Sequence, residues 1–198
     1  MTFARPIVPA AALLLAVSLS ACSSGTVAPS SPSAAPAPSP TTAGEKAPGV
    51  LSTFTATDLD GNEIDQSILA DSDLTMVNVW GTFCPPCRAE MPDLAALHEE
   101  YADQGVQIVG IVSDVLNQDG TLNEDQVEEA RTIALDAGVS YTNLLPSKSL
   151  YPVLGQIYAL PSTFFVDSEG NQVGGFYMGA QSREKWAAII EETLEEVQ

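Results

Sequence analysis

Two cysteines separated by two prolines, Cys84-Pro85-Pro86-Cys87, constrain the fold of this chain more than any other feature. A largely apolar run from Leu74 to Trp80, typical of a strand covered on both faces, leads through Gly81 into this motif. A helical pattern of apolar residues follows directly from Pro86. The first cysteine is therefore expected at the amino end of a helix, where unpaired backbone N–H groups and the helix dipole stabilise an anion.

This placement predicts redox chemistry at the cysteine pair. The anion at the helix start is a thiolate, which is the nucleophilic form of cysteine. Two intervening residues bring the sulfur atoms close enough to form and break one disulfide. We expect Cys84 to attack or receive a substrate sulfur and Cys87 to resolve the mixed disulfide. The electrons reside in the pair itself, so no separate cofactor is predicted.

The first 21 residues have the pattern of an export signal. Arg5 precedes an apolar run over residues 10–19 that is too short to span a bilayer stably. The run leads into Leu19-Ser20-Ala21-Cys22, which resembles the lipobox of bacterial lipoproteins. The resemblance implies that the thiol of Cys22 is diacylated and becomes part of the mature amino terminus. An ordinary signal peptide with a stray cysteine is the alternative.

The composition changes twice along the chain and predicts three parts. After the signal peptide, residues 22–48 are almost entirely Ala, Pro, Ser, Thr and Gly, which cannot bury a core. We expect this segment to be a disordered, lipid-anchored linker that holds a domain away from a membrane surface. A single folded domain is expected over residues 49–198.

The net charge argues against nucleic acid as a partner. The chain has 26 acidic residues against 7 basic ones, for a formal net charge of −19. Too few cations are available to neutralise phosphates. We interpret the acidic surplus as a solvated surface, and steering of a basic partner is the alternative.

Hydrophobic patterning within the domain alternates strands and helices after a short amino-terminal hairpin. Asn123 is a candidate N-cap with Gln126 at the capping-box position, and Ser182 opens a final amphipathic helix. This order predicts an α/β fold in which helices cover a sheet. Beyond the strand and helix that flank the cysteines, we expect strands near residues 106–112, 142–145, 163–167 and 172–177, and helices near 124–137, 148–157 and 182–197.

Several separated segments resemble thioredoxins, and more narrowly the exported, membrane-attached TlpA/ResA-like branch. Residues 80–84 match the family's Trp-x-x-Trp-Cys, except that Phe83 replaces the second Trp. Leu160-Pro161-Ser162-Thr163 matches the cis-proline loop, and Pro92 lies where thioredoxins have a helix-kinking proline. Asn78 agrees with the ResA-like branch, because thioredoxins proper have a buried aspartate there. The resemblance implies a thioredoxin fold: a central mixed sheet covered by helices, an amino-terminal hairpin and an inserted helix.

The resemblance also implies roles for residues outside the cysteine pair. Glu90 lies where ResA-like proteins carry an active-site glutamate, so we expect it to assist proton transfer to Cys87. An ordinary exposed helical carboxylate is the alternative. Pro161 is expected to follow a cis bond that faces the cysteines, which makes the expected catalytic set Cys84, Cys87, Glu90 and Pro161. The expected substrate-binding residues are Trp80, Phe83, Pro85, Pro86 and Leu160.

The expected function is that of an extracytoplasmic thiol–disulfide oxidoreductase, lipid-anchored to the cell membrane, which reduces disulfides. Pro85 and Pro86 have no N–H, so only the N–H groups of Cys87 and Arg88 remain to stabilise a thiolate on the first cysteine. An ionised Glu90 would disfavour that thiolate further. The expected partners are cysteine-containing exported proteins and an upstream membrane thiol donor. The ResA-like resemblance implies a link to cytochrome c maturation.

Other functions remain open on the sequence alone. An exported thiol oxidase or isomerase would use the same pair. A peroxidase of this fold needs a Thr and an Arg arranged around its cysteine, a copper carrier needs wider cysteine spacing, and a binding lipoprotein would carry a vestigial motif. No metal site is predicted, because a closed zinc site needs four ligands. His98 is the only histidine, and we expect it to face solvent.

Overall fold

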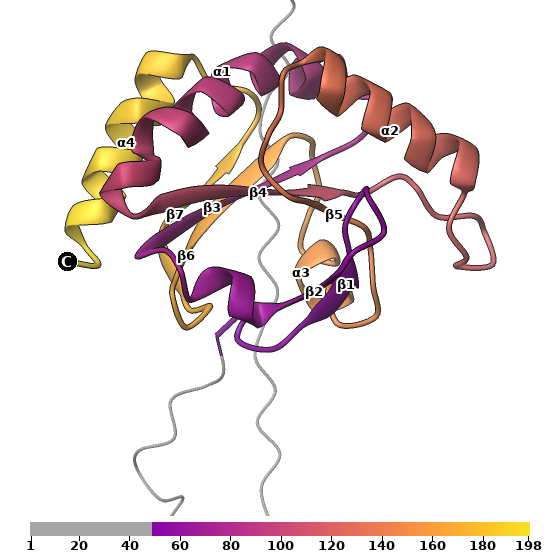
Figure 1. The fold of residues 1–198 in the computed structure, drawn as a ribbon, viewed down its shortest axis with the longest axis horizontal. Coiled ribbons are helices and arrows are strands. Elements are labelled where there is room, and N and C mark those ends of the chain that lie inside the picture. The colour runs from indigo at the N-terminus through magenta and orange to yellow at the C-terminus, as the bar shows by residue number, and fades with distance from the viewer. Residues whose placement is uncertain (1–48) are drawn as a thin grey trace, which may run out of the picture. The chain divides into compact units, whose positions relative to one another are not determined.

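The computed structural model describes residues 49–198 of the chain. Five strands of this part form one mixed sheet in the order β5-β4-β3-β6-β7, and two more form a separate hairpin (Figure 1). The elements in chain order are β1 (Thr55–Thr57), β2 (Glu63–Asp65), β3 (Leu74–Trp80), α1 (Pro85–Tyr101), β4 (Val106–Val112), α2 (Glu124–Asp136), β5 (Asn143–Leu144), α3 (Tyr151–Leu154), β6 (Ser162–Asp167), β7 (Gln172–Met178) and α4 (Arg183–Glu195).

The central strand of the sheet is β3, which carries the chain into the cysteine motif. It pairs in parallel with β4 and antiparallel with β6. Every residue of β3 is buried, because layers cover the sheet on both faces. The expected limits of β3 and β4 are confirmed, and so is the expected antiparallel hairpin of β1 and β2.

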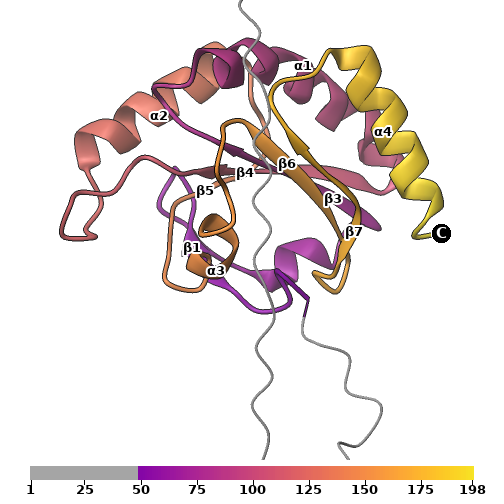
Figure 2. The ribbon, with the colours of Figure 1, turned by 180° about the vertical axis from the view of Figure 1, so that it is seen from behind.

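Two layers cover the sheet. Helices α1, α2 and α4 lie on one side, and α3 and the β1–β2 hairpin lie on the other; Figure 2 shows the same layers from behind. The core under α1 and α4 is apolar and includes fully buried Trp186. The core on the opposite face includes Phe54 from the hairpin side and Phe164 from β6. Burial of apolar surface on both faces of one sheet is the main stabilising contribution in such a fold.

Two expected helix starts are confirmed by their caps. The side chain of Asn123 accepts the N–H of Gln126 at 3.3 Å, and the side chain of Ser182 accepts the N–H of Lys185 at 3.4 Å. The expected reciprocal bond from the Gln126 side chain does not form. The N–H of Asn123 instead donates to the carbonyl of Val115 at 2.9 Å, so it has no need of the Gln126 amide.

The prediction of a helix over residues 148–157 is wrong in length, because the helix in the structure is shorter. The structure has only α3, which spans Tyr151–Leu154. The hydroxyl of Ser149 accepts the N–H of Thr55 at 3.0 Å and donates to its carbonyl at 2.8 Å. These bonds tie the segment before α3 to strand β1, and local helix propensity cannot anticipate such a long-range tie.

His98 does not face solvent as expected. Its side chain is half-buried, and Nδ1 accepts the backbone N–H of Ile108 at 3.1 Å. Its ring meets the ring of Tyr141 edge-on at 5.7 Å. Desolvation by burial lowers the pKa of His98. The histidine therefore joins α1 to the start of β4 and serves packing.

Candidate active site

A disulfide joins Cys84 and Cys87 at the point where β3 gives way to α1. The two Cα atoms are 5.3 Å apart. Cys84 is the N-cap of α1, and its sulfur accepts the N–H of Cys87 at 3.3 Å. Cys84 is 4% exposed, whereas Cys87 is fully buried behind it. An external partner can therefore approach only the first cysteine.

Only one of the two expected backbone donors reaches the sulfur of Cys84. The N–H of Arg88 donates to the carbonyl of Cys84 at 3.2 Å, as the first turn of the helix requires. The expectation that Arg88 also serves the sulfur is wrong for this reason. Pro85 and Pro86 have no N–H to offer, so the donor set around the first sulfur is smaller than expected.

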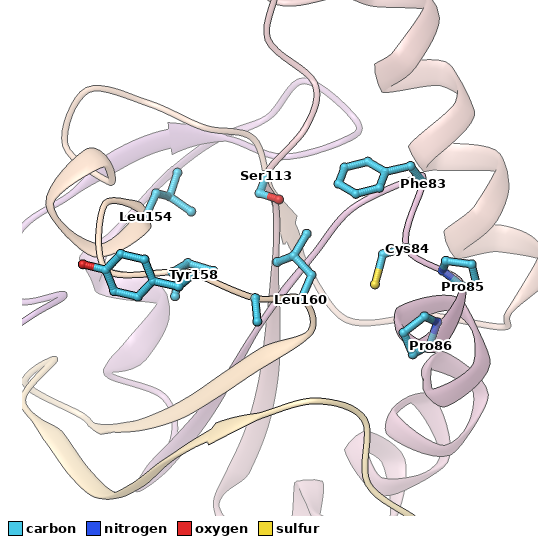
Figure 3. Close-up of a pocket in the computed structure, with 10 residues that line it drawn as sticks. Phe83, Cys84, Pro85, Pro86, Ser113, Leu154, Tyr158 and Leu160 are labelled. Carbon is cyan, nitrogen blue, oxygen red and sulfur yellow. The ribbon is translucent and has the colours of Figure 1, made fainter. Parts of the chain in front are cut away.

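A mostly apolar pocket of about 610 Å³ opens beside Cys84 (Figure 3). Residues 83–86 form one wall and residues 154 and 157–160 form the other, and Ser113 lies between them. Two aromatic side chains project from the walls, because Phe83 is 70% exposed and Tyr158 is 88% exposed. A pocket of this shape and polarity can hold a short extended peptide next to a reactive sulfur.

Four of the five expected substrate-binding residues line this pocket, namely Phe83, Pro85, Pro86 and Leu160. Trp80 does not line it, since its side chain is fully buried. Its Nε1 donates to Oδ1 of Asn143 at 2.8 Å, on the β5 side of the sheet. We therefore correct the expected role of Trp80: it supports the site from within the core.

The peptide bond between Leu160 and Pro161 is cis, as the resemblance implied. Leu160 lines the pocket opposite the cysteine motif (Figure 3), whereas Pro161 is buried and is not among the residues that line the pocket. The carbonyl of Pro161 accepts the N–H of Gly179 at 2.8 Å, which fixes the loop against the end of β7. The loop is therefore held rigidly across the pocket from Cys84.

Glu90 is buried in α1 and only 3% exposed, which excludes the alternative of an ordinary surface carboxylate. Its Oε1 accepts from Nδ2 of Asn78 at 3.1 Å. Its Oε2 accepts from the N–H of Gln181 and from Nε1 of Trp186, each at 3.2 Å. Asn78 also donates to the hydroxyl of Thr163 at 3.0 Å. Glu90 thus joins strand β3 to the start of α4, and Asn78 extends the network to β6.

Burial raises the pKa of Glu90 above the ordinary glutamate value of 4.5. The three hydrogen bonds work in the opposite direction, because each favours the ionised carboxylate, and the desolvation penalty outweighs them. A carboxyl group whose pKa is raised toward neutrality suits proton transfer. None of the hydrogen bonds found for Glu90 in the described part of the chain goes to either cysteine.

Sequence reasoning missed two polar residues of the site, Asp114 and Gln126. Oδ2 of Asp114 accepts the N–H of Thr82 at 2.8 Å and its hydroxyl at 2.6 Å. The amide of Gln126 donates to the same oxygen at 3.3 Å. The available signal was position: Asp114 follows β4, and the carboxyl ends of adjacent parallel strands meet at one edge of a sheet.

No metal-binding cluster and no membrane-spanning helix is found within residues 49–198. No group of three or more His, Cys, Asp or Glu side chains there could hold an ion. No helix in the same range is long and apolar enough to cross a bilayer. The expected signal peptide, linker and lipidated Cys22 lie outside the described residues and stay predictions.

A comparison with family models finds one that spans most of the chain. The model described as the AhpC/TSA family matches residues 43–172. The chain belongs to the AhpC/TSA family. Within this family, a curated relative, the thiol-disulfide oxidoreductase ResA of a Bacillus cereus strain, is 28% identical over 148 residues. The match covers 75% of this chain and 76% of the relative, so the resemblance to ResA-like proteins is confirmed.

Solved structures show that this AhpC/TSA member has a thioredoxin fold. A thiol:disulfide interchange protein of the thioredoxin family from Chlorobium tepidum TLS superposes with a TM-score of 0.60 at 24% identity, covering 76% of this chain and 99% of that one. The pneumococcal exposed lipoprotein thioredoxin from Streptococcus pneumoniae gives 0.52 at 24% identity, covering 73% and 98%. The expected fold and enzyme class are confirmed: the chain is a thioredoxin-fold thiol–disulfide oxidoreductase.

Proposed function

We propose that this protein reduces disulfides in cysteine-containing exported proteins outside the cytoplasmic membrane. The observation that carries the proposal is the asymmetry of the pair: Cys84 faces a pocket, and Cys87 is fully buried behind it. A nucleophile that a partner can reach and a second thiol that it cannot reach are what stepwise thiol–disulfide exchange requires.

The reaction runs in two exchanges. In the reduced pair, the Cys84 thiolate attacks one sulfur of the partner disulfide, and the other partner sulfur leaves and takes up a proton. Cys87 then loses its proton and attacks the sulfur of Cys84, which releases the second partner thiol and forms the Cys84–Cys87 disulfide. Two electrons pass to the partner, and an upstream membrane thiol donor returns two electrons to the pair.

The second exchange needs a proton acceptor for Cys87, which has no contact with solvent. We assign this assistance to Glu90, a buried carboxyl group on the same helix with a raised pKa. Asn78 and Trp186 hold its two oxygens in place. Pro161 shapes the opposite wall, along which the extended backbone of the partner lies. Phe83, Pro85, Pro86 and Leu160 provide apolar contacts to that segment.

The structure supports the reducing direction through the small donor set at Cys84. A strongly oxidising pair is one whose reduced, thiolate-bearing form is stabilised. Here a single backbone N–H, that of Cys87, reaches the first sulfur. No histidine lies between the cysteines, and two prolines occupy the turn. These features favour the disulfide, so the reduction potential is expected near the thioredoxin value of about −270 mV.

The proposed location is the outer face of the cell membrane, with Cys22 as the lipid attachment site. The lipobox-like segment Leu19-Ser20-Ala21-Cys22 supports this proposal, as does the likeness to an exposed lipoprotein thioredoxin. Residues 22–48 supply the tether. Among exported proteins, the ResA-like resemblance favours as substrate the disulfide formed by the cysteine pair of apocytochrome c, and we propose on this basis a role in cytochrome c maturation.

The proposal is tested by trapping the partner on the Cys87→Ala variant. Without the resolving thiol, Cys84 stays joined to its partner, and the mixed disulfide is isolated and identified by mass spectrometry. The Cys84→Ala variant is the matched control and should trap nothing. Equal recovery of partners on both variants would contradict the assigned roles. Failure of the wild-type protein to reduce insulin disulfides would favour a binding lipoprotein instead.

A further inference from the structure

Asp114 makes a cluster of contacts around the segment that presents Cys84. Its Oδ2 accepts the N–H and the hydroxyl of Thr82 at 2.8 and 2.6 Å, and the N–H of Phe83 at 3.4 Å. Its Oδ1 is buried and has no hydrogen-bond partner among the described residues. An unpaired buried carboxylate oxygen is costly, and the contacts of the other oxygen offset that cost.

The same oxygen connects the inserted helix α2 to the cysteine motif. The Gln126 amide, in the first turn of α2, donates to Oδ2 of Asp114 at 3.3 Å and to the hydroxyl of Thr82 at 3.1 Å. Helix α2 itself starts at the Asn123 cap, so the position of Gln126 is fixed by the helix. One carboxylate therefore joins the end of β4, the segment before Cys84 and the inserted helix.

Gly81 shows how closely these segments pack. A Cβ atom at Gly81 would lie 3.3 Å from the Asp114 carboxylate and 3.2 Å from Cδ1 of Leu160. Both contacts are tighter than an ordinary van der Waals separation of about 3.5–4.0 Å. The segment before Cys84 is thus packed closely against both the Asp114 carboxylate and Leu160 of the cis-proline loop.

We propose that Asp114 is a positioning residue that sets the balance between the dithiol and the disulfide of Cys84 and Cys87. It does so by holding residues 81–83 in the geometry that the disulfide requires, and Gln126 extends this control to helix α2. The inference rests on the proposed function only in that it concerns the same cysteine pair. The equilibrium between the dithiol and the disulfide of that pair exists whatever proteins the pair reacts with.

The physical argument compares the two redox states. The disulfide itself restrains the segment before Cys84, whereas in the dithiol that restraint comes from Asp114. Loosening the segment therefore adds more conformational freedom to the dithiol than to the disulfide, and it lowers the effective concentration of one thiol at the other. A neutral amide accepts weaker hydrogen bonds than a carboxylate does, so Asp114→Asn loosens the hold on Thr82 and Phe83. This loosening shifts the pair toward the dithiol.

The test measures the equilibrium of the full chain with glutathione. One oxidised glutathione takes two electrons and two protons from the dithiol and yields two reduced glutathione molecules and the protein disulfide. Asp114→Asn keeps the size of the side chain and removes the charge. We expect its equilibrium constant for disulfide formation to fall by about threefold or more. Asp119→Asn is the matched control: Asp119 is exposed in the same loop, and the hydrogen bonds found for its side chain within residues 49–198 go to Thr121.

Gln126→Leu is the second variant and removes, at a half-buried position, the amide that donates to both Asp114 and Thr82. We expect a smaller shift in the same direction, and no additional shift when it is combined with Asp114→Asn. The proposal is overturned if the constant is unchanged in both variants while their urea midpoints fall, because that describes a purely structural contact. It is also overturned if Asp119→Asn shifts the constant as much as Asp114→Asn does. Trapping of partners on Cys87→Ala is independent of either result, so failure here leaves the proposed function standing.

Discussion

Replacing Glu90 with glutamine should change how the stability of the protein depends on pH. Glu90 is 3% exposed, and burial raises its pKa above 4.5 despite the donors that face it. Glutamine has nearly the same shape and no charge to desolvate. Its amide can still accept from the N–H of Gln181 and from Trp186, and Asn78 can turn its own amide to accept from the new NH₂ group.

The size of the effect follows from proton linkage. Between pH 4.5 and the raised pKa of Glu90, the folded state holds a proton that the unfolded state has lost. The free energy of unfolding therefore falls as pH rises through this window, by at most about 1.4 kcal/mol per pH unit for one group. The Glu90→Gln variant has no such group to titrate, so it does not lose this part of its stability as the pH rises. The stability of the variant relative to wild type should rise across the window and level off above it.

The assay is urea unfolding of the oxidised protein at half-unit steps from pH 4 to pH 8. The two buried tryptophans, Trp80 and Trp186, provide the fluorescence signal. Glu129→Gln, which removes an exposed carboxylate from helix α2, is the control and should follow the wild-type curve. Parallel curves for Glu90→Gln and wild type across the whole range would refute the argument, because they would show that Glu90 titrates as it does in the unfolded chain.

Three further predictions concern the site and the amino-terminal segment. In the reduced native protein, iodoacetamide should label Cys84 and leave Cys87 unmodified until denaturant is added; equal native labelling would contradict the assigned roles. Cys22→Ala should move the protein from the membrane fraction to the soluble fraction of its host, and retention in the membrane would show that the apolar segment is an uncleaved anchor. Phe83→Ala and Tyr158→Ala should each lower kcat/KM for a protein disulfide by about threefold to tenfold with little change toward dithiothreitol, since each removes an exposed pocket wall. An equal loss toward both substrates would argue against peptide binding in the pocket.

The elements set by local pattern were predictable from the sequence. β3 and β4 follow largely apolar runs, and the expected limits of both agree with the structure. The cysteine pair at the start of α1 and the Ser182 cap of α4 were also readable, because a cap and the first turn it begins are close in sequence. The cis bond before Pro161 came from family resemblance rather than from periodicity.

Apart from Arg88, whose N–H is used by a bond within the first turn of α1, the features that the sequence did not reveal depend on partners far along the chain. Trp80 lies in a strand covered on both faces, so alternation gives no sign of which way its side chain points. The role of Asp114 depends on Thr82, 32 residues earlier. The burial of Glu90 depends on Trp186, 96 residues later. A sequence pattern of 3.6-residue or 2-residue period carries no information on such contacts.

The reduction potential of the Cys84–Cys87 pair tests the central claim most directly. The full chain is equilibrated with graded glutathione or dithiothreitol buffers, and the dithiol fraction is counted by alkylation and mass spectrometry. A reducing role predicts a value of about −270 mV. A single backbone N–H reaches the first sulfur, and no histidine lies between the cysteines, so the thiolate form is weakly stabilised. A value above about −180 mV, in the range of protein disulfide isomerase, would contradict the account and identify an oxidase or isomerase.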